Sequence, residues 1–151
     1  MLKINRQTDY AVRVVLALAK EDEGARLSSG QIRRQMLIPP ALMSRIVAQL
    51  ARAGLVNTFP GREGGLMLPR PASQITLRDV VEAFEGPILL SECLQVKGEE
   101  DCPFQSNCPV SSKWGRVQLA MLREMAAITF ESLAQEALGV PVKIPGPVPV
   151  R

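Results

Sequence analysis

Apolar side chains recur at three- and four-residue steps along the first twenty residues, a spacing typical of an amphipathic helix. The segment runs from about Arg6 to Lys20, and Tyr10, Val14 and Leu18 share one of its faces. Neighbouring apolar positions widen that face until the segment is nearly apolar all round. We expect a helix that is largely buried.

Two further helices follow, and both have clear start signals. Ser28 and Gln31 form a capping box that starts the second helix. Pro40 suits the first turn of a third helix, which we expect to run to Ala53 and to end at Gly54. Two helices joined by a turn of about four residues predict a helix-turn-helix motif.

The apolar period then changes from that of a helix to that of a strand. Residues 55–59 and 66–68 read as two short strands, and the segment 60–65 between them contains three glycines. A hairpin with a Gly/Arg tip directly after the third helix predicts a winged helix. The expected fold class is therefore mainly α with a small β-hairpin.

The second half of the chain adds two more expected helices. Thr76 and Asp79 form a capping box for a helix over residues 77–85. An apolar stripe from Trp114 to Leu133 predicts one long helix from about Ser111 to Leu138. Such a helix outgrows a domain of this size, so we expect it to pack along the same helix of a second copy, although packing on its own domain is the alternative.

These elements divide the chain into four regions. Residues 1–87 are the expected winged helix-turn-helix domain, and residues 88–110 form a loop that contains every cysteine. Residues 111–139 are the expected dimerisation helix. Residues 140–151 contain four prolines and are expected to be a flexible tail.

The charge is unevenly spread between the two halves. Residues 1–70 carry eleven Lys and Arg against five Asp and Glu, a net charge of +6. Residues 71–151 carry seven against ten, a net charge of −3. A basic helix-turn-helix half favours double-stranded DNA as the partner, with a protein-binding winged helix as the alternative.

The third helix and the hairpin tip supply the expected DNA contacts. Arg45 could bind a guanine edge, Ser44 a base or a phosphate, and Arg62 a minor groove or a phosphate strand. Small side chains on the same helix would permit close approach to the bases. The expected DNA-binding residues are Ser28, Arg33, Ala41, Ser44, Arg45, Arg52, Gly61 and Arg62.

Composition narrows the class of protein. The 151 residues include three cysteines and no histidine, and no apolar run is long enough to span a membrane. We find no signal peptide and expect a cytoplasmic protein with reduced thiols. A cysteine enzyme would need a base, and neither a Cys–His pair nor a phosphate-binding loop is present, so we do not expect an enzyme.

Cys93, Cys102 and Cys108 lie within sixteen residues, with gaps of eight and five residues between them. Thiolates are soft ligands that suit zinc, copper(I) or iron–sulfur clusters. The gaps are wider than the two-residue knuckle usual for structural zinc, which favours a larger ligand such as a cluster. A structural zinc or a thiol redox switch remains open.

Several short motifs extend the pattern over residues 1 to about 138. They are Thr8–Ala11, Gly61–Gly65 with Leu68, Ile75–Val80, the three cysteines and Trp114. In combination they resemble the Rrf-type family of winged-helix transcription regulators, which includes IscR-like and NsrR-like members. The resemblance implies a homodimeric transcription regulator. In the cluster-binding members of the family, three cysteines and one non-cysteine ligand hold a [2Fe–2S] or [4Fe–4S] centre.

The fourth ligand differs among the members of that family. A histidine, as in IscR-like members, is impossible in this chain. Asp9 matches the aspartate that NsrR-like members supply from the partner subunit; otherwise it is an acid favoured by the helix dipole. The first gap between cysteines is also longer than is usual in the family.

We expect the state of the loop to set the spacing of the two DNA-reading heads.

Overall fold

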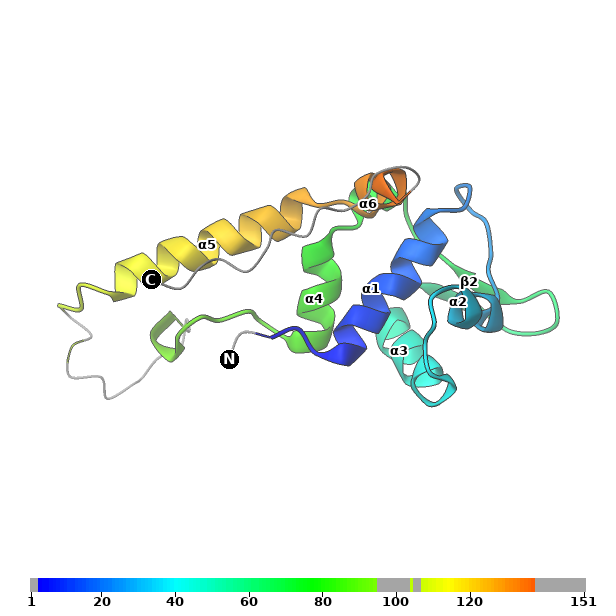
Figure 1. Ribbon diagram of the computed structural model, residues 1–151, viewed down its shortest axis with the longest axis horizontal. Coiled ribbons are helices and arrows are strands. Elements are labelled where there is room, and N and C mark those ends of the chain that lie inside the picture. Colours follow the sequence, from blue (N-terminus) through cyan, green and yellow to red (C-terminus); the bar gives the residue numbers. More distant parts are fainter. Residues whose placement is uncertain (1–2, 95–103, 105–106, 138–151) are drawn as a thin grey trace.

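The computed structural model describes residues 3–94, 104 and 107–137 (Figure 1). These residues form six α-helices, two short 3-10 helices and one two-stranded antiparallel sheet. The predicted mainly α fold with a small hairpin is thereby confirmed. In chain order, the elements are α1 (Arg6–Ala19), α2 (Ser29–Gln35), α3 (Pro40–Arg52), β1 (Asn57–Phe59), β2 (Gly65–Met67), η1 (Ala72–Gln74), α4 (Leu77–Glu85), η2 (Glu92–Leu94), α5 (Ser111–Ala127) and α6 (Phe130–Glu136).

Helix α1 is the centre of the hydrophobic core. Its residues Ala11, Val14 and Val15 are fully buried, and α2, α3, α4 and α6 all pack against it. A helix that neighbours cover on several sides needs apolar residues on most of its surface. The nearly continuous apolar pattern of this segment is therefore explained by its central place.

Both predicted capping boxes are formed. The Ser28 hydroxyl accepts from the Gln31 N–H at 3.1 Å, and the Gln31 side chain accepts from the Ser28 N–H at 2.8 Å. At α4, Thr76 and Asp79 make the equivalent pair. Each box satisfies two backbone groups that the first turn of a helix would otherwise leave unpaired.

Strands β1 and β2 form the predicted hairpin, and we call residues 57–67 the wing. The strands are shorter than predicted, because Leu55 and Val56 are buried in the core before the pairing begins at Asn57. The wing is also tied to the rest of the domain. Leu27 and Leu66 exchange two backbone hydrogen bonds, of 3.0 and 2.7 Å. The segment just before α2 therefore fixes where the wing stands.

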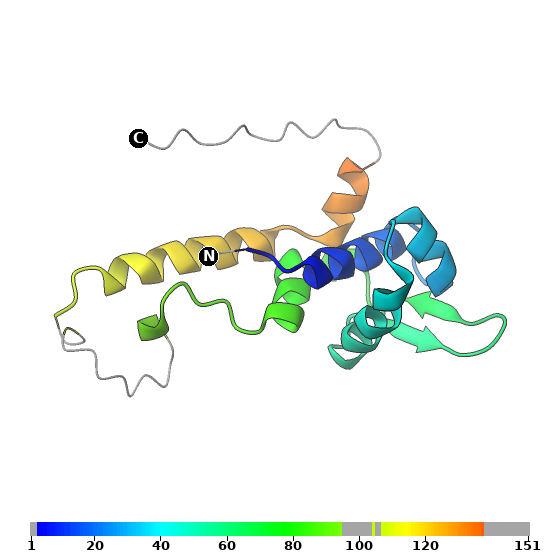
Figure 2. The same cartoon turned by 60° about the horizontal axis from the view of Figure 1, so that its bottom comes forward.

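The prediction of one helix from Ser111 to Leu138 was wrong. Helix α5 ends at Ala127, and Ile128 has an extended backbone with ψ of 105°. Thr129 then caps a separate helix, α6, by accepting from the Ser132 N–H. Figure 2 shows α6 turned away from the axis of α5 and lying over α1.

Backbone pairing across the domain is the physical reason for this break. The Leu77 N–H donates to the Ile128 carbonyl, and the Phe130 N–H donates to the Ile75 carbonyl, each at 2.9 Å. The break also places Phe130 in the core, with no exposed surface. Burial of an aromatic side chain stabilises a fold by a few kcal/mol, about enough to offset the hydrogen bonds that a continuous helix would gain.

Helix α5 lacks such a core. It projects away from the other helices (Figure 1) and contacts α4, yet none of its seventeen residues is buried. Trp114, Val117 and Leu119 are exposed along it. Among the described residues, no helix has both the length and the apolar composition needed to cross a membrane.

Candidate nucleic-acid interface and cysteine loop

Helix α3 has one buried and one exposed face. Met43, Ile46 and Leu50 are buried in the core, whereas Val47 is only half-buried and packs at the edge of the core. The opposite face carries small and basic residues that are free to approach a ligand. The exposed residues there are Ala41, Ser44, Arg45 and Ala48.

Contacts at both ends hold α3 in place. Pro40 begins the helix, where its missing N–H leaves no bond unmade. Near the other end, the Gln49 side chain donates to the Ala83 carbonyl of α4 at 3.0 Å. Arg52 is exposed but turns back on its own helix, with Nε donating to the Ala48 carbonyl at 3.3 Å. The exposed face of α3 is therefore presented by a fixed helix.

The wing and the start of α2 enclose a shallow groove of about 280 Å³. Ser28, Gly61 and Arg62, three of the predicted contact residues, line it together with Val47. Arg33 lies elsewhere, half-buried on α2, and Arg45 lies outside the groove on α3. The predicted residues thus form two neighbouring groups rather than one pocket.

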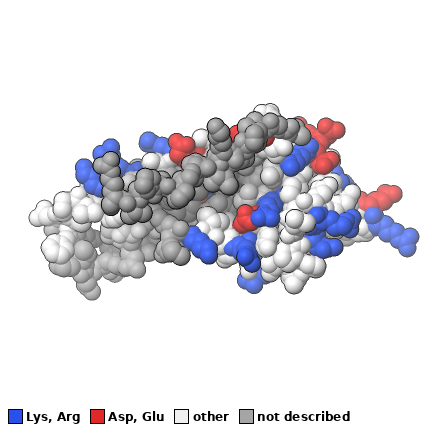
Figure 3. All heavy atoms as spheres, viewed as in Figure 1, with Lys and Arg blue, Asp and Glu red and all other residues white. Residues whose placement is uncertain are grey.

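The segment that contains α2, α3 and the first half of the wing is more basic than the predicted contact residues alone indicated. Between Gly24 and Arg62 the chain contains six arginines and no Asp or Glu. On the face seen in Figure 3, basic side chains lie over α2 and at the tip of the wing, where an acidic side chain lies beside them, and further acidic side chains gather over the segment after α1. Such a stretch attracts polyanions.

Arg26 is a member of this group that the sequence pattern did not reveal. Its guanidinium lies 3.8 Å from the centre of the Phe59 ring on β1. A cation over an aromatic face is held by the negative charge of the ring centre. The contact joins residues more than thirty positions apart, so no local motif could have shown that Arg26 stands beside the wing.

Asp9 lies in the first turn of α1 and is paired within its own chain. Its carboxylate is 2.7 Å from the Arg13 guanidinium, and both side chains are half-exposed. A pair of this kind contributes only about 0.3–0.5 kcal/mol and is easily exchanged for another partner. Asp9 also borders an apolar groove of about 780 Å³ formed with Leu77, Val81 and Met125.

The described parts of the cysteine loop lie against the start of α5. Cys93 is exposed on η2, with its Sγ 3.2 Å from the Ser91 hydroxyl, and Cys108 is half-buried just before α5. Both are free thiols, and Cys102 lies outside the described residues. Within the described ranges alone, no three metal-binding side chains come together.

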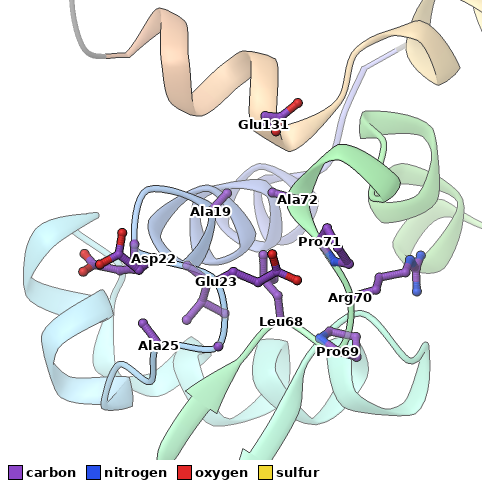
Figure 4. Close-up of a pocket in the computed structure, with 13 residues that line it drawn as sticks. Ala19, Asp22, Glu23, Ala25, Leu68, Pro69, Arg70, Pro71, Ala72 and Glu131 are labelled. Carbon is purple, nitrogen blue, oxygen red and sulfur yellow. The ribbon is translucent and has the colours of Figure 1, made fainter.

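Another cavity, of about 340 Å³, opens on a different side of the domain (Figure 4). It lies between the segment after α1 and the connector before η1, with Glu131 of α6 beside it. Glu21, Asp22 and Glu23 also line it, and the single Arg70 donates to backbone carbonyls of Gln74 and Gly54. This acidic lining would repel phosphates, so the cavity is not part of a DNA interface.

The sequence model of the Rrf2 family, whose description is "Iron-dependent Transcriptional regulator", matches residues 4–136. The chain belongs to the Rrf2 family. This match covers all the described elements, and it confirms the resemblance that the short motifs indicated.

Individual proteins are also similar to this chain over most of its length. Protein aau3 of Rhizobium meliloti is 36% identical over 135 residues, which are 89% of this chain and 86% of that protein. The structure of CymR, the global cysteine regulator of B. subtilis, has a TM-score of 0.70 at 29% identity and covers 89% of this chain and 98% of its own. The T. potens IscR structure has a TM-score of 0.66 at 22% identity, covering 90% and 88%, and it supports the fold alone.

Proposed function

We propose that this Rrf2 protein is a homodimeric transcription regulator that binds double-stranded promoter DNA through α3 and the wing. The observation that carries the proposal is the exposed face of α3 within a stretch that contains six arginines and no acid. The N-terminal part of α3 would enter the major groove, as recognition helices do, with Ser44 and Arg45 on base edges. Ala41 and Ala48 would allow the helix to approach closely.

The wing and the surrounding basic residues would bind the DNA backbone. Arg62 at the wing tip would reach a minor groove or a phosphate strand, and Gly61 beside it leaves room for that approach. Ser28 and Arg33 of α2 and Arg52 of α3 would contact phosphates, which position the protein but do not read sequence. Both groups of predicted residues would then serve one continuous DNA interface.

Helix α5 would form the dimer interface. It is seventeen residues long, three of its large apolar side chains are exposed, and none of its residues is buried in a single chain. A helix with exposed Trp114, Val117 and Leu119 gains stability by packing along a symmetry mate. Pairing through α5 would place two heads side by side on one DNA.

The three cysteines would hold an iron–sulfur cluster, whose loss or oxidation supplies the signal. Their soft thiolates suit such a group, and the exposure of Cys93 leaves its sulfur accessible to a ligand. The family description as iron-dependent supports this choice among the possible metals. Asp9 of the partner subunit would supply the fourth ligand after exchanging its Arg13 pair.

The cysteine loop is linked to the winged-helix domain through α5, which contacts α4. The Leu90 N–H donates to the Gln118 side chain at 3.0 Å, and Leu94 packs against Gly115, so the segment carrying Cys93 lies along α5. When its thiols share one centre, the loop would be held on the first turns of α5. Release of the loop would free α5 relative to α4 and change the spacing of the two heads.

The Cys102→Ala variant tests this sensing role. We expect the wild-type protein purified without oxygen to be brown and to contain iron and acid-labile sulfide, and Cys102→Ala to contain neither. Ser112→Ala, at the exposed start of α5, is the control and should keep both. Circular dichroism should show the same helix content in all three proteins. A colourless wild-type protein with one zinc per chain would contradict the cluster.

A thiol switch without a cluster is the second candidate, favoured by the exposure of Cys93. CymR, which has a closely similar structure, is described as a global cysteine regulator. In that case, the protein would contain no iron, and reversible oxidation of its thiols would change DNA affinity. The iron and sulfide analysis of the wild-type protein therefore separates the two mechanisms.

Two arginine variants test the DNA interface. We expect Arg45→Ala to weaken binding by about ten- to a hundredfold and to relax preference at one base position, because a bidentate base contact is worth about 1–3 kcal/mol. Arg62→Ala should weaken binding to all sequences and lower the salt slope by about one. Fluorescence anisotropy with duplex DNA over a range of salt concentrations measures both effects. Unchanged binding by both variants would remove α3 and the wing from the interface.

A further inference from the structure

The turn between α2 and α3 contains the only described residue other than glycine with a left-handed backbone. Leu37 has φ of 53°, a conformation that brings its Cβ close to its own carbonyl oxygen. It follows the last residues of α2, at the position where helices commonly end with glycine. The Ile38 N–H donates back to the Arg33 carbonyl at 3.0 Å. This is the hydrogen bond that closes a helix C-terminus in the Schellman motif.

The Leu37 side chain is not buried against its own chain. It is 80% exposed, the highest value among the large hydrophobic residues described as exposed. The next residue, Ile38, is buried and supplies the apolar contact that this helix ending needs. Glycine or asparagine would allow the same backbone at lower cost, so leucine here destabilises the free protein.

Strained residues cluster at functional sites, so a strained residue that is not needed for packing indicates a functional role. Leu37 lies three positions before Pro40, the first residue of α3, and directly after the α2 turn that holds Arg33 and Arg34. It is therefore an apolar side chain within the stretch of six arginines that contains no acid. Charge complementarity favours a polyanion that also offers apolar surface, and duplex DNA offers both deoxyribose and thymine methyl groups.

We infer that Leu37 is an apolar DNA contact at the edge of the major groove. This inference rests on the proposed docking of α3 in that groove. The side chain packs on a deoxyribose or a thymine methyl beside the site of Ser44 and Arg45. The left-handed turn directs it outwards, and the loss of water from its surface adds affinity without adding charge.

Three substitutions at this position separate the apolar contact from the backbone strain. Leu37→Gly and Leu37→Asn both tolerate the left-handed turn but remove the apolar side chain, whereas Leu37→Met keeps an apolar side chain of similar size. We expect Leu37→Gly to raise the Tm by roughly 2–6 °C and to weaken DNA binding about three- to tenfold. Leu37→Asn should weaken binding similarly, and Leu37→Met should stay within about twofold of wild type.

The measurement is anisotropy with a duplex selected by the wild-type protein from a random-sequence pool, together with thermal unfolding. The salt slope should be the same in all four proteins, because no charge changes. Replacing thymines by uracils in the duplex distinguishes the two targets. If the contact is a methyl, this change weakens the wild type but not Leu37→Gly; if it is a deoxyribose, both proteins bind the uracil duplex as before.

Wild-type affinity in Leu37→Gly would overturn the inference, and so would a changed oligomeric state with unchanged affinity, which would indicate a protein contact instead. These outcomes can be distinguished from those expected if the proposed DNA-binding function is wrong. If the wild type selects no duplex even at low salt, the DNA interface itself is wrong. If it selects one and the arginine variants lose affinity while the Leu37 variants do not, only the role of Leu37 is wrong.

Discussion

Phe130→Ala is expected to lower the free energy of unfolding by about 3–5 kcal/mol, as truncation of a buried aromatic residue usually does. The Phe130 side chain has no exposed surface and belongs to the core cluster around α1. Its N–H also donates to the Ile75 carbonyl, so the cavity would form where α6 joins the winged-helix domain. Denaturant unfolding followed by circular dichroism measures the loss.

Phe104→Ala is the matched control for this prediction. Phe104 is the same residue type but is 68% exposed in the cysteine loop, so its truncation should change stability by less than about 0.5 kcal/mol. If the Phe130 variant unfolds like the control, α6 does not belong to the core.

Gly64→Ala should disrupt the wing. A Cβ at Gly64 would lie 2.1 Å from the Phe59 carbonyl oxygen and 2.8 Å from the backbone of Pro60. Backbone atoms cannot move aside as a flexible side chain can, so the backbone of the hairpin must shift, at a cost of about 1–3 kcal/mol. Because the wing carries Arg62, DNA affinity should fall by more than it does in Arg62→Ala.

Gly24→Ala is the control for the Gly64 variant, because it adds backbone strain without a steric clash. Gly24 has φ of 82°, but an added Cβ there would meet nothing within 4 Å. It should cost about 1 kcal/mol of stability and leave DNA affinity unchanged. Amide exchange at Leu27 and Leu66 reports on the wing directly, and rapid exchange is expected only in the Gly64 variant. Slow exchange there would show that the hairpin tolerates the methyl group.

The sequence could predict those elements whose signals are local. The capping boxes at Ser28 and Thr76 lie within four residues, so the starts of α2 and α4 were correct. The start of α3 at Pro40 was correct for the same reason. Exposure of Ser44 and Arg45 followed from the helical period, since the buried face of α3 is strictly opposite.

Other features depend on contacts between distant residues and could not be read locally. The break before Phe130 results from pairing with Ile75, more than fifty positions earlier. Nor could the pattern show that Asp9 is paired with Arg13 rather than free, because a helical spacing of four permits the pair without requiring it. The left-handed turn at Leu37 had no signal, because leucine is the wrong residue for it.

The position of Phe130 in the core also has a consequence for synthesis of the protein. The DNA-binding domain needs a residue that the ribosome adds only after the cysteine loop and α5 have been made. We expect nascent chains that end after α4 to lack a complete core and to stay open. Any folded winged-helix domain would then already be joined to the cysteine loop and α5.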